Sequence, residues 1–138
     1  MSFANIYDIA GSSMAAQTTR LNTIASNLAN VDSAAASAEE AYKSIKPIFE
    51  AVYHGTGVDA NPAASVAVTN LTTTLDNADM RFEPNHPLAD ADGYVAYSNV
   101  DPIVEVADMM SATQNFEASV NVMNRARSMQ QSLLNLGT

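Results

Sequence analysis

Apolar residues between Phe3 and Val31 recur at alternating spacings of four and three residues. A repeat of this kind, sustained over four heptads, is typical of a coiled-coil seam. A helix of this length spans roughly 44 Å, so it needs a long partner to pack against. The sequence predicts a helix over about 3–28, with a seam that only Gln17 interrupts: Phe3, Tyr7, Ala10, Met14, Gln17, Leu21, Ile24, Leu28 and Val31.

A second helical pattern occupies the end of the chain. Asp101 suits the N-cap, Pro102 the first helical position, and Gly137 is a residue type that closes helices. Its seam has two runs that are out of phase, which predicts local overwinding after Met123. The first run is Val106, Met109, Thr113, Phe116, Val120 and Met123, and the second is Ala126, Met129, Leu133 and Leu136. We expect the two helices to pack together, parallel or antiparallel, each with a further face left for other chains.

The segment between the helices has a different character. Alternating side chains from Phe49 to Tyr53 predict a short strand, and Pro47 places it at a sheet edge or delays its start. The Thr-rich run from Val66 to Leu75 predicts a second strand. Turn residues at 54–57 and 59–62 separate the two. We therefore expect a β-hairpin or ribbon over about 42–75.

Two further parts of the middle segment carry weaker signals. Residues 33–40 are small and polar, and they fit either a continued helix or a loop. Asp90–Gly93 predicts a tight turn, and Tyr94–Tyr97 a short strand after it. The expected fold class is mainly α with a small β-rich insert, the long terminal helices forming a coiled-coil-like pair. We divide this single unit into an N-terminal assembly helix (1–33), an insert (34–100) and a C-terminal assembly helix (101–138).

Composition narrows the class of partner. Fifteen acidic residues against six basic ones give a formal net charge of −9. This balance argues against nucleic acid and against anionic membrane surfaces, both of which need clustered Lys and Arg. Solubility is the simpler explanation of the charge. No uncharged apolar run approaches the ~20 residues that span a bilayer, and no basic residue precedes Arg20. The residues alone therefore predict no cleavable signal peptide and a cytoplasmic location, unless another export route is used.

Residues suited to catalysis or metal binding are few. The chain has no cysteine, which excludes thiol chemistry and disulfides. Asp90 and Asp92 resemble the start of a calcium loop, but Ser98 stands where the closing Glu is needed. His54 and His86 lack acidic neighbours at ligand spacing. We expect no catalytic, cofactor or metal site. The methionines of the last helix fit seam packing better than an adaptable binding surface: Met109, Met110, Met123 and Met129.

Polar residues mark the two ends of the first helix. Ser2 is a candidate N-cap. Asn27, Asn30 and Asp32 follow the last apolar turn, and Asn tolerates the left-handed conformation that closes helices. The two amides alternatively bond to neighbouring subunits. From these residues alone, capping is the favoured interpretation.

Both terminal helices carry motifs of a known family. Residues 16–31 read AQTTRLNTIASNLANV, and residues 98–137 read SNVDPIVEVADMMSATQNFEASVNVMNRARSMQQSLLNLG. They are similar to the paired terminal motifs of the bacterial flagellar axial (rod and hook) family. The segment FEPNHPLADADGYVAYSNVD at 82–101 and the early NIYDIAGSSMAAQ most resemble the proximal-rod member. An Ala-rich stretch replaces the Gly/Pro loop usual after the first motif, and residues 40–75 match only loosely.

The resemblance implies a structural subunit of the proximal rod, without catalytic activity. Such subunits assemble through their terminal helices into a helical tube that crosses the periplasm and transmits torque. They are exported through the flagellar type III apparatus, with disordered termini and no cleavable signal. Implied partners are copies of the chain, other rod proteins, the export apparatus and the inner-membrane ring at the rod base. The expected subunit-interface residues are Tyr7, Met14, Arg20, Leu21, Asn22, Ile24, Asn27, Leu28, Asn30, Val31, Met109, Phe116, Val120, Met123, Asn124 and Leu133.

Three alternatives remain at this point. Another rod or hook subunit belongs to the same class, and a small cytoplasmic coiled-coil adaptor to a different one. A metal-dependent enzyme survives only through Asp90 and Asp92. In a rod, contacts of Asn27 and Asn30 with other subunits become at least as plausible as capping.

Overall fold

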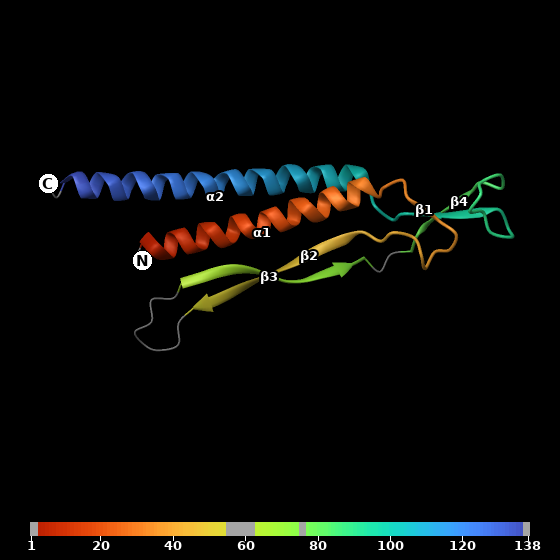
Figure 1. The fold of residues 1–138 in the computed structure, drawn as a ribbon, viewed down its shortest axis with the longest axis horizontal. Coiled ribbons are helices and arrows are strands. Elements are labelled where there is room, and N and C mark those ends of the chain that lie inside the picture. The colour runs from red at the N-terminus through yellow and green to blue at the C-terminus, as the bar shows by residue number, and fades with distance from the viewer. Residues whose placement is uncertain (1–2, 55–62, 75–76, 137–138) are drawn as a thin grey trace.

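The structure is a computed structural model that describes residues 3–54, 63–74 and 77–136. Two long helices form one elongated body, and short antiparallel strands occupy the segment between them (Figure 1). This arrangement confirms the expected fold class. In chain order the elements are α1 (Phe3–Ala29), β1 (Ala34–Ala35), β2 (Ile45–His54), β3 (Ala63–Thr73), β4 (Asp79–Phe82), β5 (Tyr94–Tyr97) and α2 (Pro102–Leu136).

Helix α1 lies between two partners. On one side α2 runs antiparallel to it, and on another side the β2–β3 ribbon packs along it (Figure 1). The small sheet of β1, β5 and β4 lies beyond the end of α1, next to the start of α2. The C-terminal end of α2 is at the opposite pole of the molecule. Because α1 has partners on two sides, it buries more of its surface than α2 does.

Capping occurs at both helix ends that face the sheet. The Asp101 carboxylate accepts hydrogen bonds from the backbone N–H groups of Ile103 at 2.9 Å and Val104 at 3.4 Å, which confirms it as the N-cap of α2. At the end of α1, Asn30 Nδ2 donates to the carbonyl of Ser26 at 2.8 Å. No described residue other than glycine has a positive φ. Asn30 therefore closes the helix through its side chain, and not through the left-handed backbone that the sequence had suggested. The expected caps Ser2 and Gly137 lie outside the described residues.

The β2–β3 ribbon confirms the predicted hairpin. Its antiparallel register pairs Ile45 with Thr73 and Tyr53 with Ala64. The register shifts between Ile48 and Phe49: Ile48 pairs with Asn70 and Phe49 with Val68, so β3 has one extra residue at this point. Pro47 sits within β2, which has a partner strand on one side only, so it is at a sheet edge as expected. Of the predicted turn residues at 54–57 and 59–62, His54 is the last residue of β2 and the others lie outside the described residues.

The small sheet has the order β1-β5-β4. Residues 34–35 pair with β5, so the segment after α1 forms a short strand and turns, and does not continue the helix. Val95, in the central strand, is fully buried. The turn before β5 is confirmed: Gly93 N–H bonds the Asp90 carbonyl at 3.1 Å, with Gly93 at φ +84°. A side chain there would meet Phe82 at 3.0 Å, so the close approach of β4 requires glycine.

In α2, three of the six positions in the first predicted run of the seam are displaced by one residue: the contact uses 105, 112 and 119 in place of 106, 113 and 120. The buried residues of α2 are Glu105, Ala112 and Ala126, and Ser119 completes a row with a spacing of seven. Val106 and Thr113, which the sequence pattern assigned to the seam, are exposed. Small and polar side chains occupy the contact because the two helices approach closely. Val106 and Val120 lie on its flank, and their hydrophobicity placed half of the predicted seam one residue away from the observed one.

The predicted phase slip after Met123 is also wrong. A second row, Met109, Phe116 and Met123, is half-buried at the same spacing of seven. Its next member, Gln130, accepts a hydrogen bond from the Tyr7 hydroxyl at 3.4 Å. Ala126 continues the first row in phase. One uninterrupted heptad pattern therefore describes the contact, and no overwinding is needed to explain it.

Candidate assembly surface

Polar pairs set the register of α1 against α2. Ser13 and Ser119 hydroxyls lie 3.0 Å apart, and Arg20 forms an ion pair with Asp108 at 2.7 Å. Asn27 Nδ2 donates to the Glu105 carboxylate at 3.0 Å. The three α1 members are seven residues apart, so they project in the same direction from the helix. Polar groups at a helix contact fix register because a slip leaves each of them without a partner.

Asn27 joins α1 to the start of β2. It is 1% exposed. Its Oδ1 accepts hydrogen bonds from the Ile45 N–H at 2.9 Å and the Tyr42 hydroxyl at 3.0 Å, while Nδ2 donates to the Ile45 carbonyl at 2.9 Å. The amide thus pairs with both backbone groups of Ile45, as a neighbouring strand would. This two-point contact begins the ribbon at a fixed place on α1.

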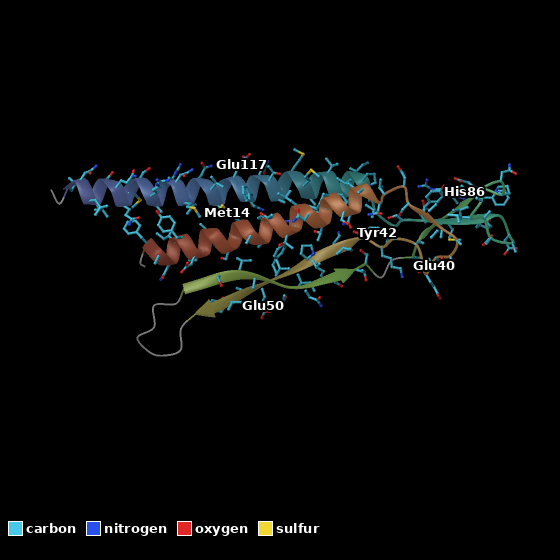
Figure 2. The ribbon with its side chains drawn as sticks, in the orientation of Figure 1. Met14, Glu40, Tyr42, Glu50, His86 and Glu117 are labelled. Carbon is cyan, nitrogen blue, oxygen red and sulfur yellow. The ribbon has the colours of Figure 1, made fainter. Side chains whose placement is uncertain are left out.

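Glu105 brings α2 into the same cluster. It is 3% exposed, and its Oε1 accepts hydrogen bonds from Asn27 Nδ2 and from the Ser44 hydroxyl at 3.2 Å. The Ser44 N–H in turn donates to the Asn99 side chain at 2.8 Å. We call Asn27, Tyr42, Ser44, Ile45 and Glu105 the polar cluster; Figure 2 labels Tyr42 within it. The polar cluster fastens both helices and the ribbon at the end nearest the sheet.

Sequence reasoning missed most of this cluster. Glu105 lies in the first turn of α2, where acidic residues are common because the helix dipole favours them, so its place there did not mark it as buried. The signal that was available is the spacing of Glu105, Ala112, Ser119 and Ala126, which contains no large apolar residue. A seam built from small residues is hard to recognise by hydrophobicity alone.

The structure places the expected interface residues in three groups. Ile24 and Asn27 are buried, and Asn22, Asn124 and Leu133 are exposed. The side chain of Asn27 is occupied within the chain and is not free for a neighbouring subunit in this conformation. The remaining expected residues are half-buried, partly covered by the chain itself: Tyr7, Met14, Arg20, Leu21, Leu28, Asn30, Val31, Met109, Phe116, Val120 and Met123.

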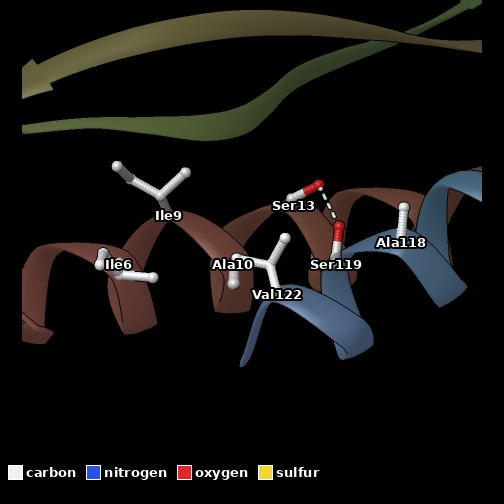
Figure 3. A pocket seen from close by; sticks show the side chains of 7 residues that line it. All are labelled: Ile6, Ile9, Ala10, Ser13, Ala118, Ser119 and Val122. Atoms are coloured by element: carbon white, nitrogen blue, oxygen red, sulfur yellow. Dashed lines mark hydrogen bonds between the residues drawn. The ribbon is translucent and has the colours of Figure 1, made fainter. Parts of the chain in front are cut away.

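A groove lies between the two helices away from the sheet (Figure 3). It has a volume of about 240 Å³, and the Ser13–Ser119 hydrogen bond crosses it. Apart from these serines, its lining is apolar: Ile6, Ile9, Ala10, Ala118 and Val122. The sequence seams did not include Ile6, Ile9 or Val122, since these residues flank the helix contact.

Much of the apolar surface of α2 has no partner within the described residues. Met109 and Met123 are half-buried in the seam, whereas Met110 is 62% exposed. Seam packing is therefore confirmed for Met109 and Met123, whereas Met110 and Met129 are exposed and a binding role for them stays a prediction. Exposure is greatest near the C-terminal end of the helix, where Leu136 is 83% exposed. The exposed large apolar residues of α2 are Ile103, Val104, Val106, Met110, Val122, Met129, Leu133, Leu134 and Leu136. A helix with this much exposed apolar surface is typical of a subunit that packs against others.

The charged groups of the sheet make contacts within the sheet and its turns. Arg81 bonds Asp79 at 3.0 Å and lies over the Tyr97 ring at 4.4 Å; this hydrogen bond raises the pKa of Arg81. Burial and a hydrogen bond to Glu83 raise the pKa of Tyr97. The Asp90 carboxylate accepts bonds from turn N–H groups. Among the described residues, no group of three acidic or histidine side chains is placed to hold a metal ion.

Comparison with known proteins identifies the family. Residues 8–34 match the family "Flagella basal body rod protein", and residues 91–136 match "Flagellar basal body rod FlgEFG protein C-terminal". The flagellar basal-body rod protein FlgC of Salmonella typhimurium is 38% identical over 99% of both chains, and that of Escherichia coli O157:H7 is equally similar. The Bacillus subtilis FlgC is 30% identical over 94% of this chain and 95% of its own length.

A helix pair with exposed apolar flanks, together with these matches at both termini, defines a structural protein of the flagellar basal-body rod, which is not an enzyme. The chain belongs to the FlgC family of rod subunits. The full-length alignments include residues 40–75, where the motifs alone gave only a loose resemblance. Within the described residues, neither helix is long and apolar enough to cross a membrane.

Proposed function

We propose that this rod subunit assembles into the proximal part of the rod as a helical tube, through α1 and α2. The observation that carries the proposal is the uncovered apolar surface of the helix pair, including the groove between Ile9 and Val122. Burial of apolar area is the main driving force of association, and here it is left unused by the single chain. The tube crosses the periplasm and transmits torque.

A tube of this kind requires contacts of two different surfaces on each subunit. A rotation that does not close generates an open helical array through heterologous contacts. The helix pair presents distinct faces on its two sides, because the ribbon covers α1 while α2 is open along most of its length. The segments 1–33 and 101–138 supply these contacts, and the insert between them holds the helix pair in register.

The chain reaches the rod through the flagellar type III export apparatus, with its terminal segments unfolded during passage and without cleavage of a signal peptide. Its partners are copies of itself, other rod proteins and the inner-membrane ring and export gate at the rod base. Membership of the rod family supports assembly with rod proteins.

Two substitutions on α1 test the proposal. Leu21→Asp and Leu28→Asp place a charge at half-buried positions of the expected assembly surface. Each should abolish rod assembly and swimming while the variant chain is still exported. Thr18→Asp, at an exposed position of the same helix, is the matched control and should retain motility. Circular dichroism of the purified variants separates lost assembly from lost folding, and normal swimming of folded Leu21→Asp would contradict the proposal.

A further inference from the structure

The two poles of the molecule carry opposite charge. The pole formed by the β1-β5-β4 sheet and its turns has one basic residue, Arg81, against eight acidic ones in the described stretches 32–40 and 77–101. Figure 2 shows Glu40 and His86 at this pole. The acidic residues are Asp32, Glu39, Glu40, Asp79, Glu83, Asp90, Asp92 and Asp101. We call this region the acidic pole.

The opposite pole is formed by the C-terminal part of α2. From 118 to 136 this helix carries Arg125 and Arg127, both exposed, and no acidic residue. The facing part of α1, from Phe3 to Thr19, has Asp8 as its single charged residue. We call residues 125–136 of α2 the basic pole. With Asp8 counted, the described residues at this end carry two basic groups against one acidic group, in contrast to the net charge of −9 of the chain as a whole.

Both poles also expose large apolar side chains. At the acidic pole, Phe82 is 63% exposed and packs edge-to-face on Tyr94, with ring centroids 5.4 Å apart. Met80 and Leu88 are exposed nearby. At the basic pole the exposed residues are Met129, Leu133, Leu134 and Leu136. Each pole thus combines exposed apolar residues with charges that are mostly of one sign, and the two signs are opposite, which is the usual pattern of complementary interfaces.

We propose that copies of this chain join end to end, with the basic pole of one copy seated on the acidic pole of the next. The proposal rests on the proposed function, because it specifies one of the heterologous contacts that a rod subunit needs. Charge complementarity selects this arrangement over contact between like poles, since the latter places Arg125 and Arg127 against a second pair of arginines. The two poles lie at opposite ends of the molecule (Figure 1). A row of copies joined in this way therefore keeps one unpaired pole at each end, where further copies can add.

Cross-linking tests the contact directly. The chain has no cysteine, so single cysteines are introduced at exposed Leu88 and Leu136 without background reaction. A short bismaleimide should link Leu88→Cys to Leu136→Cys when the two purified full-length variants are mixed. Neither variant alone should give linked dimers. Links between two copies of the same variant, or no links in the mixture, would overturn the proposal.

Charge reversal tests its physical basis. Sedimentation velocity at low salt should show oligomers beyond the dimer as the concentration rises, and fewer of them at high salt. Arg125→Glu with Arg127→Glu, or Glu40→Lys with Asp92→Lys, should each weaken association roughly tenfold. Mixing the two reversed variants should restore association, because each mutated pole then meets a pole of opposite sign on the other variant, and one chain that carries all four changes should also associate again. Lys43→Glu with Lys46→Glu, and Glu50→Lys with Glu117→Lys, are controls with the same changes in net charge and should associate normally.

The outcomes separate this proposal from the rod function. The end-to-end contact would be overturned if the chain stays monomeric, if it forms only a closed dimer, or if the charge-reversed variants associate as strongly as the unmodified chain. If the reversed variants enter basal bodies and support normal swimming, the contact is wrong while the rod function stands. If the unmodified chain is itself missing from basal bodies, the rod function fails.

Discussion

Asn27 Nδ2 lies 3.0 Å from the Glu105 carboxylate, and both side chains are almost completely buried. These two residues are the point at which the N-terminal helix, the ribbon and the C-terminal helix are joined. Because the same amide also bonds both backbone groups of Ile45, one side chain determines how three elements are aligned. The helix pair extends from this fixed end toward the opposite pole, where its contacts become fewer and its apolar residues more exposed.

Replacing Asn27 with Ala should destabilise the chain by about 2–3 kcal/mol, because it removes one of the hydrogen bonds to the buried Glu105 carboxylate and leaves the Ile45 N–H and carbonyl without their side-chain partner. Urea denaturation followed by circular dichroism measures the loss. Asn22→Ala, at an exposed position of the same helix, is the control and should change stability by less than about 0.5 kcal/mol. Equal stability of the two variants would show that the polar cluster does not hold the fold together.

The observed seam of α2 is tested by leucine at two adjacent positions. Ala112 is completely buried, so Ala112→Leu overpacks the helix contact and should cost about 1–3 kcal/mol. Thr113 is exposed, and Thr113→Leu should be nearly neutral. The seam read from hydrophobicity predicts the reverse order, with leucine favoured at position 113. Thermal denaturation of the pair decides between the two registers.

Gln17 interrupts the apolar row of α1, and its Oε1 is buried without a hydrogen-bond partner among the described residues. Replacing it with Met removes an unsatisfied polar atom while keeping a similar volume. Gln17→Met should therefore stabilise the chain by about 1 kcal/mol. Gln114→Met on the exposed face of α2 is the control, with little expected change. A less stable Gln17→Met would indicate that the amide has a bonding role in the folded chain.

Two glycines respond differently to alanine. Gly93 has φ +84°, and a Cβ added there would lie 3.0 Å from Phe82 and 3.2 Å from Pro84, so Gly93→Ala should destabilise the β4–β5 turn by about 1–2 kcal/mol. Gly11 lies within α1 with no atom within 4 Å of the added carbon, and Gly11→Ala should stabilise by about 0.5–1 kcal/mol. Denaturation curves that shift in the same direction for both variants would contradict this.

The elements of the fold were largely predictable because their signals are local. Asp101 and Pro102 marked the start of α2, and alternation around Phe49 marked β2. Turn residues at 90–93 placed the tight turn before β5. Each of these signals depends on residues close together in the sequence, so tertiary contacts did not override it.

The helix contact was less predictable for a physical reason. The seam was sought among large apolar residues, but close packing selected Ala112, Ser119 and Ala126, while Val106 was left on the flank. The burial of Glu105 depends on Asn27 and Ser44, which are far from it in the sequence. Local pattern carries no information on such a cluster. The exposed flank residues, in turn, are explained by a role in assembly rather than in the fold of one chain.

The most direct test of the rod assignment is fractionation of cells that are competent for flagellar export. Basal bodies are purified, and the chain is detected with an antibody in that fraction, in the cytoplasm and in the medium. A structural rod subunit should co-purify with basal bodies and remain there after washing with high salt. Basal bodies that carry a complete rod yet lack this chain, with the chain retained in the cytoplasm, would contradict the assignment.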